Sequence, residues 1–220
     1  MKKINKNYID FFIELSQNNH KEWFDKNRSR YESEVKIPFT DLVNSLISEL
    51  KEQEKLLDIT AKDCVFRINK DVRFSKDKQP YKLQMGASIC RNGKKDMENP
   101  GLYFEIGPEF LKIYTGVYMP DKNSLERIRI YISKNIEIFN KIISENQFLS
   151  NFEAVKGEKN KILPKHLKEL SFNHPILFNK QFYIIHQIET ENIIKLDIKQ
   201  YILDIYKTAY EFNSFLRKAL

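Results

Sequence analysis

Residues 64–95 read CVFRINKDVRFSKDKQPYKLQMGASICRNGKK, and the rest of the chain is interpreted around them. Apolar and polar side chains alternate from residue 65 to residue 74. The apolar set is Phe66, Ile68, Val72 and Phe74, and the polar set is Arg67, Asn69, Asp71 and Arg73. This period of two predicts a strand with the apolar set on a core face and the polar set on an open face. A lysine-rich loop follows, and residues 83–90 are predicted as a second strand.

The charge of the chain is concentrated in the same stretch. Residues 62–95 hold ten Lys and Arg against three Asp, an excess of seven that equals the net charge of +7 of the whole chain. A basic patch attracts phosphates or nucleic acid. The alternative is a general lysine bias, which explains Lys94 and Lys95 better than it explains Arg67 and Arg73.

The composition excludes several classes of protein. With 220 residues, 41% hydrophobic and 30% charged, the chain is long enough for a substantial core. It contains no apolar run near the ~20 residues of a membrane span and no signal peptide, so we expect a cytoplasmic protein without a membrane partner. Two cysteines, Cys64 and Cys90, are too few for a disulfide framework or a four-ligand zinc site, and we expect buried thiols.

Beyond this stretch, the pattern predicts helices before and after a run of strands. We expect N-terminal helices in residues 5–57, a sheet core in about 64–119 and C-terminal helices in 121–220. Strands are also expected at 102–106, 111–118 and 182–188, and long helices at 124–144 and 197–218. Asn19 and Ser124 are the expected N-caps, with Glu22 completing a capping box after Asn19. The predicted fold is α+β: an antiparallel β-meander packed on one face by helices, in a single domain.

Familiar catalytic motifs are absent from the sequence. There is no phosphate-binding glycine loop, no nucleophile elbow and no histidine pair at zinc-helix spacing. We therefore expect no metal and no cofactor, and whether the chain is an enzyme stays open.

The candidate site is the predicted open face with its loop and two further strands. Arginine offers a planar fork for phosphate or carboxylate, and tyrosine stacks on rings or donates a hydrogen bond. The candidate ligand-binding residues are Arg67, Asn69, Asp71, Arg73, Lys76, Lys78, Tyr81, Lys82, Tyr103 and Tyr114. The candidate catalytic residues are Asp71 and Glu105 as base and Tyr81 and Tyr118 as acid.

Two questions stay open at this point. The charged residues of the open face form either an anion site or a ladder of salt bridges that only solvates the sheet. The irregular segment 148–177 either covers the open face, which makes a pocket, or leaves it as a platform.

The stretch FRINKDVRFSKDKQPYK resembles the signature of an uncharacterised family, domain of unknown function 2461. The segments NNHKEWFDKNRSRYE and PGLYFEIGP, and the helix around Leu125, Arg127 and Arg129, are also similar to that family. Lys70 departs from the pattern, since arginine is expected there. The resemblance implies one α+β domain and a shared site, but it supplies no reaction. The implied site residues are Arg67, Asp71, Arg73, Phe74, Asp77, Lys78, Pro80, Tyr81 and Lys82.

Three functions from different classes follow from these residues. The first is binding of an anionic, phosphate-bearing partner, either a small molecule or nucleic acid. The second is an enzyme that acts on a small anionic substrate. The third is a structural or interaction domain in which Asp77 and Pro80 shape the loop.

Overall fold

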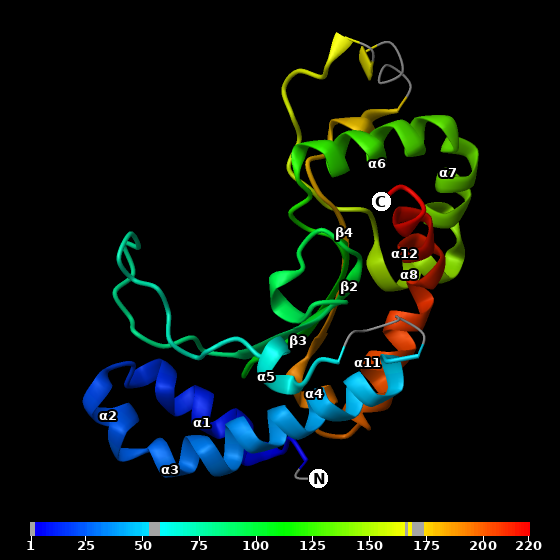
Figure 1. Cartoon of the computed structure of the whole chain (residues 1–220). Helices are drawn as coiled ribbons and strands as arrows, with labels where there is room; N and C mark the ends of the chain where they lie inside the picture. The colour runs from blue at the N-terminus through cyan, green and yellow to red at the C-terminus, as the bar shows by residue number, and fades with distance from the viewer. Residues whose placement is uncertain (1–2, 53–57, 166, 169–173) are drawn as a thin grey trace. The chain divides into compact units, whose positions relative to one another are not determined.

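The computed structural model describes residues 3–52, 58–165, 167–168 and 174–220. Among these residues, four strands form an antiparallel sheet in the order β1-β2-β3-β4, which is also their order along the chain. Figure 1 labels β2, β3 and β4 of this sheet. Their bounds are Met85–Ile89 (β1), Gly101–Ile106 (β2), Phe110–Val117 (β3) and Phe182–Glu189 (β4). Together with the helices, this sheet confirms the predicted α+β class.

Alternation of side chains along the sheet follows the sequence pattern most clearly in β3. There Leu111, Ile113, Thr115 and Val117 are buried, and the residues between them are half-buried. One face of this strand therefore packs into the core while the other is partly open to solvent, as period two requires.

The chain divides into two compact units. The first contains residues Met1–Lys94, Tyr103–Lys112 and Gln187–Leu203, and the second contains Lys95–Leu102, Ile113–His186 and Asp204–Leu220. Strand β1 belongs to the first unit, and the residues of β2, β3 and β4 are divided between both. The prediction of a single domain stays a prediction.

The first unit is built on N-terminal helices whose aromatic side chains meet. Its helices are α1 (Lys6–Gln17), α2 (Lys21–Lys26), α3 (Arg28–Arg30), the π-helix η1 (Tyr31–Lys36), α4 (Ile37–Leu50), α5 (Ala61–Cys64) and α10 (Thr190–Ile193). The ring of Phe11 lies 5.6–6.3 Å from the rings of Phe12, Trp23, Phe24 and Tyr31. These edge-on and tilted contacts bury much of the aromatic content of α1 and α2 in one cluster.

The predicted N-cap of α2 is wrong by one residue. His20 is the cap, and its Nδ1 accepts the backbone N–H of Trp23. Asn19 instead turns its side chain to Tyr81, so its carboxamide is used in a long-range contact rather than a helix cap.

The second unit packs helices around phenylalanines. Its helices are α6 (Lys122–Lys134), α7 (Ile136–Ser144), α8 (Asn146–Phe152), the 3₁₀ helix η3 (Pro175–Phe178) and α12 (Tyr210–Arg217), while α11 (Ile198–Thr208) contributes its last residues. Phe139 lies 6.3 Å from Phe212 and 5.3 Å from Phe215, and Phe148 lies 5.9 Å from Phe212. These rings join α7, α8 and α12 in one core.

Two long helices predicted in this part of the chain are each divided. The helix expected at 124–144 begins after Asp121, which caps it in place of Ser124, and breaks at Asn135. The helix expected at 197–218 breaks at Ala209. Apolar periodicity continues across both breaks, so the hydrophobic pattern alone does not reveal them.

The strand predicted at 65–74 is wrong. Only Val65 and Asn69 form isolated bridges, to Ala87 and Tyr81 respectively, and the predicted 83–90 strand shortens to β1. The expected core residue Phe74 is 97% exposed. The sequence contains the reason. Every second residue from Phe66 should be apolar, but position 70 is a lysine, so the alternation breaks after Ile68.

Part of the irregular segment 148–177 lies along the outer edge of the sheet. Lys156 pairs with Tyr183 of β4, with the Lys156 N–H donating to the Tyr183 carbonyl at 2.7 Å, and Lys159 pairs with Asn179. This part of the segment continues the backbone ladder beyond β4 and protects the strand edge. Residues 166 and 169–173 lie outside the described residues.

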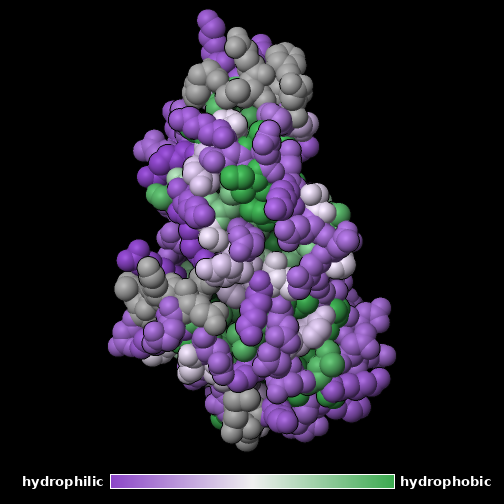
Figure 2. Space-filling model, turned by 90° about the vertical axis from the view of Figure 1, so that its right-hand side faces the viewer, coloured by the Kyte–Doolittle hydropathy of each residue, from purple (hydrophilic) through white to green (hydrophobic). Residues whose placement is uncertain are grey.

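Both cysteines are free and buried, as expected. Burial, followed by the neighbouring Cys90, raises the pKa of the Cys64 thiol to about 12. Figure 2 shows one face of the molecule, where hydrophilic side chains cover most of the surface and hydrophobic ones lie in groups between them. In the described part of the chain, no helix combines the length and the apolar character that crossing a membrane requires.

Gly116 occupies a position that only glycine suits. Its φ is +112°, and a Cβ there would collide with the Phe182 carbonyl oxygen and lie 2.8 Å from the Tyr183 Cα. We expect Gly116→Ala to lower the free energy of unfolding by about 3 kcal/mol or more, measured by urea denaturation. Gly107→Ala is the matched control, because Gly107 has no positive φ and its nearest atoms lie at 3.3 Å. Equal losses in the two variants would contradict the argument from backbone strain.

Candidate anion-binding site

Residues 65–82 form a hairpin-like excursion between α5 and β1, called here the 65–82 hairpin. The Phe66 N–H donates to the Gly86 carbonyl at 2.9 Å, which starts the hairpin beside β1. Its two limbs pair through Lys82 N–H to Ile68 carbonyl and Lys70 N–H to Pro80 carbonyl, both at 2.8 Å. Beyond these bonds the chain projects away from the helices of the first unit (Figure 1).

The base of the hairpin is fixed by Asn19 and Phe24. The Asn19 Nδ2 donates to the Tyr81 carbonyl at 3.0 Å, and the Tyr81 N–H donates to the Asn19 Oδ1 at 3.1 Å. The Tyr81 ring stacks on Phe24 at 4.0 Å with an interplanar angle of 16°. Tyr81 is only 5% exposed, and burial raises the pKa of its hydroxyl. The predicted ligand-binding and acid residue Tyr81 therefore lies in the packing between the hairpin and α2.

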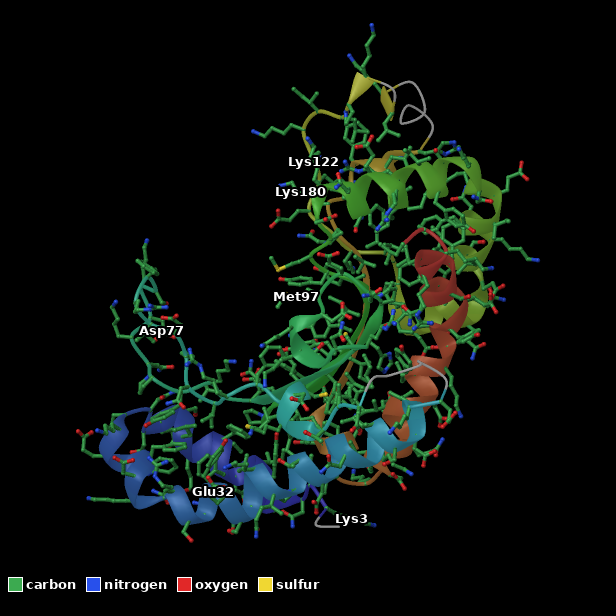
Figure 3. All side chains as sticks on the ribbon, viewed as in Figure 1. Lys3, Glu32, Asp77, Met97, Lys122 and Lys180 are labelled. Carbon is green, nitrogen blue, oxygen red and sulfur yellow. The ribbon has the colours of Figure 1, made fainter. Side chains whose placement is uncertain are left out.

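Ion pairs within the hairpin shape its outer part. Asp77 accepts from Lys70 Nζ at 2.8 Å and from the Gln79 N–H at 2.9 Å. Asp71 receives a two-pronged contact from Arg73, at 2.9 Å from Nε and 2.6 Å from Nη2. These bonds hold the pKa of both carboxyls below the usual range. Figure 3 labels Asp77 on this outer part.

Not every cation of the basic stretch is available to a ligand. Lys94 Nζ donates to the carbonyls of Lys62 and Val65, both at 2.8 Å, and so ties the turn after β1 to the end of α5. Lys78 Nζ donates to the Val72 carbonyl at 3.1 Å. These two lysines contribute to the folded backbone as well as to the charge.

A second group of side chains gathers where the hairpin leaves β1, and we call it the Arg67–Lys82 face. It consists of Phe66, Arg67, Lys82, Tyr103 and Glu105. Lys82 Nζ lies 5.4 Å from the Phe66 ring, whose edge-on neighbour is Tyr103 at 5.9 Å. The Tyr103 hydroxyl donates to Glu105 at 3.0 Å. Gly86 makes room for this arrangement, because a Cβ there would lie 3.1 Å from the Tyr103 hydroxyl oxygen.

The positive charges of Arg67 and Lys82 on this face repel one another. Burial lowers the pKa of Lys82, and the positive charge of Arg67 lowers it further, while Glu105 acts in the opposite direction. Arg67 is exposed, and its guanidinium makes no hydrogen bond or ion pair with any residue that the structure describes. Arg67 also lies near enough to Asp71 to lower the pKa of that carboxyl.

The remaining predicted residues are distributed over both units. Asn69 and Lys76 are exposed on the hairpin. Tyr114 and Tyr118 belong to the second unit, where their rings lie 6.5 and 5.7 Å from the ring of Tyr183. Within the first unit the structure thus brings together Arg67, Lys82, Tyr103 and Glu105, and it pairs Arg73 with Asp71.

Sequence reasoning missed several residues of this arrangement. Alternation predicts Phe66 on the core face, whereas in the structure its ring lies beneath the Lys82 ammonium group. The sequence pattern marks Asn19 only as a helix cap, because its partner Tyr81 lies far away in the sequence. In the second unit, the ring contact of Tyr183 with Tyr118 also joins residues that are distant in the sequence.

A family model of conserved hypothetical proteins, DUF2461, matches residues 7–215, nearly the whole chain. The chain belongs to this family. Comparison with curated proteins gives no match. The hairpin motif therefore identified the DUF2461 family correctly from the sequence.

The structure shows the contact that Lys70 makes at the position where the sequence motif predicts an arginine. Lys70 reaches Asp77 through its single ammonium group, where an arginine would offer a planar fork with two parallel donors. Among the described residues, no cluster of three or more His, Cys, Asp or Glu side chains suits a metal ion.

The repulsion between Arg67 and Lys82 predicts how the pKa of Lys82 changes in two variants. Arg67→Ala removes a positive charge near Lys82, so it should raise the pKa of Lys82. Glu105→Gln removes a negative charge that stabilises the charged lysine, so it should lower that pKa. NMR detection of the Lys82 side chain during a pH titration measures both shifts.

Lys195→Ala serves as the control for these titrations. It removes an exposed lysine on another segment and should leave the Lys82 titration unchanged. Identical Lys82 titrations in the wild type and in Arg67→Ala would show that the two cations do not interact.

Proposed function

We propose that the chain binds a phosphate-bearing ligand, nucleic acid in particular, at the Arg67–Lys82 face. The observation that carries the proposal is the exposed guanidinium of Arg67, unpaired among the described residues, beside a half-buried lysine of the same charge. The face holds two cations, Arg67 and Lys82, and one carboxylate, Glu105, which leaves an excess of positive charge. A bound phosphate would relieve their repulsion.

The chemistry of the two side chains suits a phosphate. The arginine fork donates two parallel hydrogen bonds to phosphate oxygens, and the ammonium group of lysine adds a compact charge. Because Lys82 is half-buried over Phe66, its charge is less screened by water than that of a fully exposed lysine. A bound anion would favour the charged form of Lys82 and raise its pKa.

Further cations on the hairpin favour a polymer over a single phosphate. Residues 65–82 contain six Lys and Arg against two Asp. Lys76 is exposed and makes no hydrogen bond or ion pair within the described ranges, and Arg73 is exposed although it contacts Asp71. Successive phosphates of a nucleic acid strand present charges for several such cations. We also propose a cytoplasmic location, which two free thiols support.

The enzyme alternative has less support from the contacts. Of its candidate groups, Asp71 is paired with Arg73 and Tyr81 is stacked on Phe24. Glu105 accepts a hydrogen bond from Tyr103 and remains the best-placed carboxylate for such a role.

The proposal predicts salt-dependent binding that requires both cations. In fluorescence-anisotropy titrations with a short labelled single-stranded DNA, we expect affinity to fall steeply with salt. The double variant Arg67→Ala, Lys82→Ala should bind more weakly, and the slope of log K against log salt should shrink by about 1.4, for two lost phosphate contacts.

The matched control is the double variant Lys195→Ala, Lys218→Ala, which removes the same charge from exposed lysines elsewhere. It should keep most of the affinity and the slope. Equal weakening by the two double variants would mean that binding follows net charge alone, and absence of binding at low salt would refute the proposal.

A further inference from the structure

Phe74 is exposed to an extent that packing does not explain. It is 97% exposed, and the next most exposed large hydrophobic residue in the described part of the chain is Ile162 at 82%. Burial of a phenylalanine ring stabilises a folded protein substantially, and an exposed ring does not gain this free energy. Single exposed apolar residues are common, but this one lies between Arg73 and Lys76, on the hairpin that carries the proposed site.

The hairpin around Phe74 is closed by its own contacts rather than loose. Lys70 donates to Asp77 across the hairpin, and Lys78 donates to the Val72 carbonyl. These two hydrogen bonds join the residues before the turn at 73–76 to the residues after it. Arg73 is held by Asp71, with its guanidinium carbon 5.9 Å from the Phe74 ring. The structure thus presents the ring on a supported turn, next to an arginine.

We propose that Phe74 stacks on an unpaired base of a single-stranded nucleic acid, and this inference rests on the proposed function. Arg73, Lys76 and Lys78 surround the ring in sequence, and this positive charge favours a polyanion over an apolar protein surface. Proteins that bind single strands without sequence preference combine positive charge along the backbone with aromatic side chains on which bases stack. Duplex DNA does not offer an equivalent base face, because its bases are stacked within the helix.

Binding is compared for three labelled probes: a single-stranded DNA, the same strand with abasic sites, and the corresponding duplex. Phe74→Ala should weaken binding of the intact single strand about tenfold, since that is the scale of one base–aromatic stack. It should leave the abasic strand and the duplex unchanged. The salt slope should also stay unchanged, because no phosphate contact is removed.

Two variants sharpen the comparison. Phe74→Trp retains a stacking ring and should keep the affinity, and in a Trp23→Phe background its indole fluorescence should be quenched by the intact strand and not by the abasic one. Ile162→Ala is the control, because it removes another highly exposed apolar side chain and should leave all three affinities unchanged.

The outcomes separate this inference from the proposed function. If Arg67→Ala, Lys82→Ala weakens binding but Phe74→Ala does not, stacking is overturned and phosphate binding stands. If Phe74→Ala weakens all three probes equally, the ring does not contact a base. If no probe binds at low salt, both proposals fail. Self-association that disappears in Phe74→Ala, without any effect on DNA, would assign the ring to a contact between copies and overturn stacking.

Discussion

Two hydrogen bonds between the Asn19 carboxamide and the backbone of Tyr81 attach the returning limb of the 65–82 hairpin to the N-terminal helices. The carboxamide offers a donor and an acceptor in the geometry of a strand partner. It therefore satisfies both backbone groups of Tyr81, whose neighbours Pro80 and Lys82 pair with the other limb of the hairpin. The stack of Tyr81 on Phe24 adds apolar contact to the same point. Everything that the hairpin presents, including Arg67, Phe74 and Lys82, is positioned relative to this attachment.

From this attachment outward, the hairpin changes from a packed to a solvated structure. Near its base Lys82 is half-buried over Phe66, and at its far end the aspartates satisfy neighbouring cations and backbone groups. The ion pairs are exposed, so each contributes little to stability. Their main effect is to restrict the shape of the loop and the direction of Arg73.

The parts of the fold with strict periodicity were predictable from the sequence. Leu111 to Val117 alternates without interruption, and β3 follows it residue by residue. The hairpin motif also identified the family. In contrast, the adjacency of Arg67 and Lys82 depends on the backbone pairing of Ile68 with Lys82 across the hairpin, which periodicity does not encode. Alternation predicts Phe74 in the core, but the charged side chain of Lys70 interrupts the series of apolar positions, and Phe74 is exposed.

The two buried thiols allow the opening of the first unit to be measured by chemical labelling. A thiol reacts with alkylating agents as the thiolate, and a pKa of about 12 leaves Cys64 almost wholly protonated at neutral pH. Cys64 and Cys90 both lie within the interior of the unit that holds the hairpin. Their alkylation therefore requires the unit to open, and the labelling rate reports the free energy of that opening without any introduced probe.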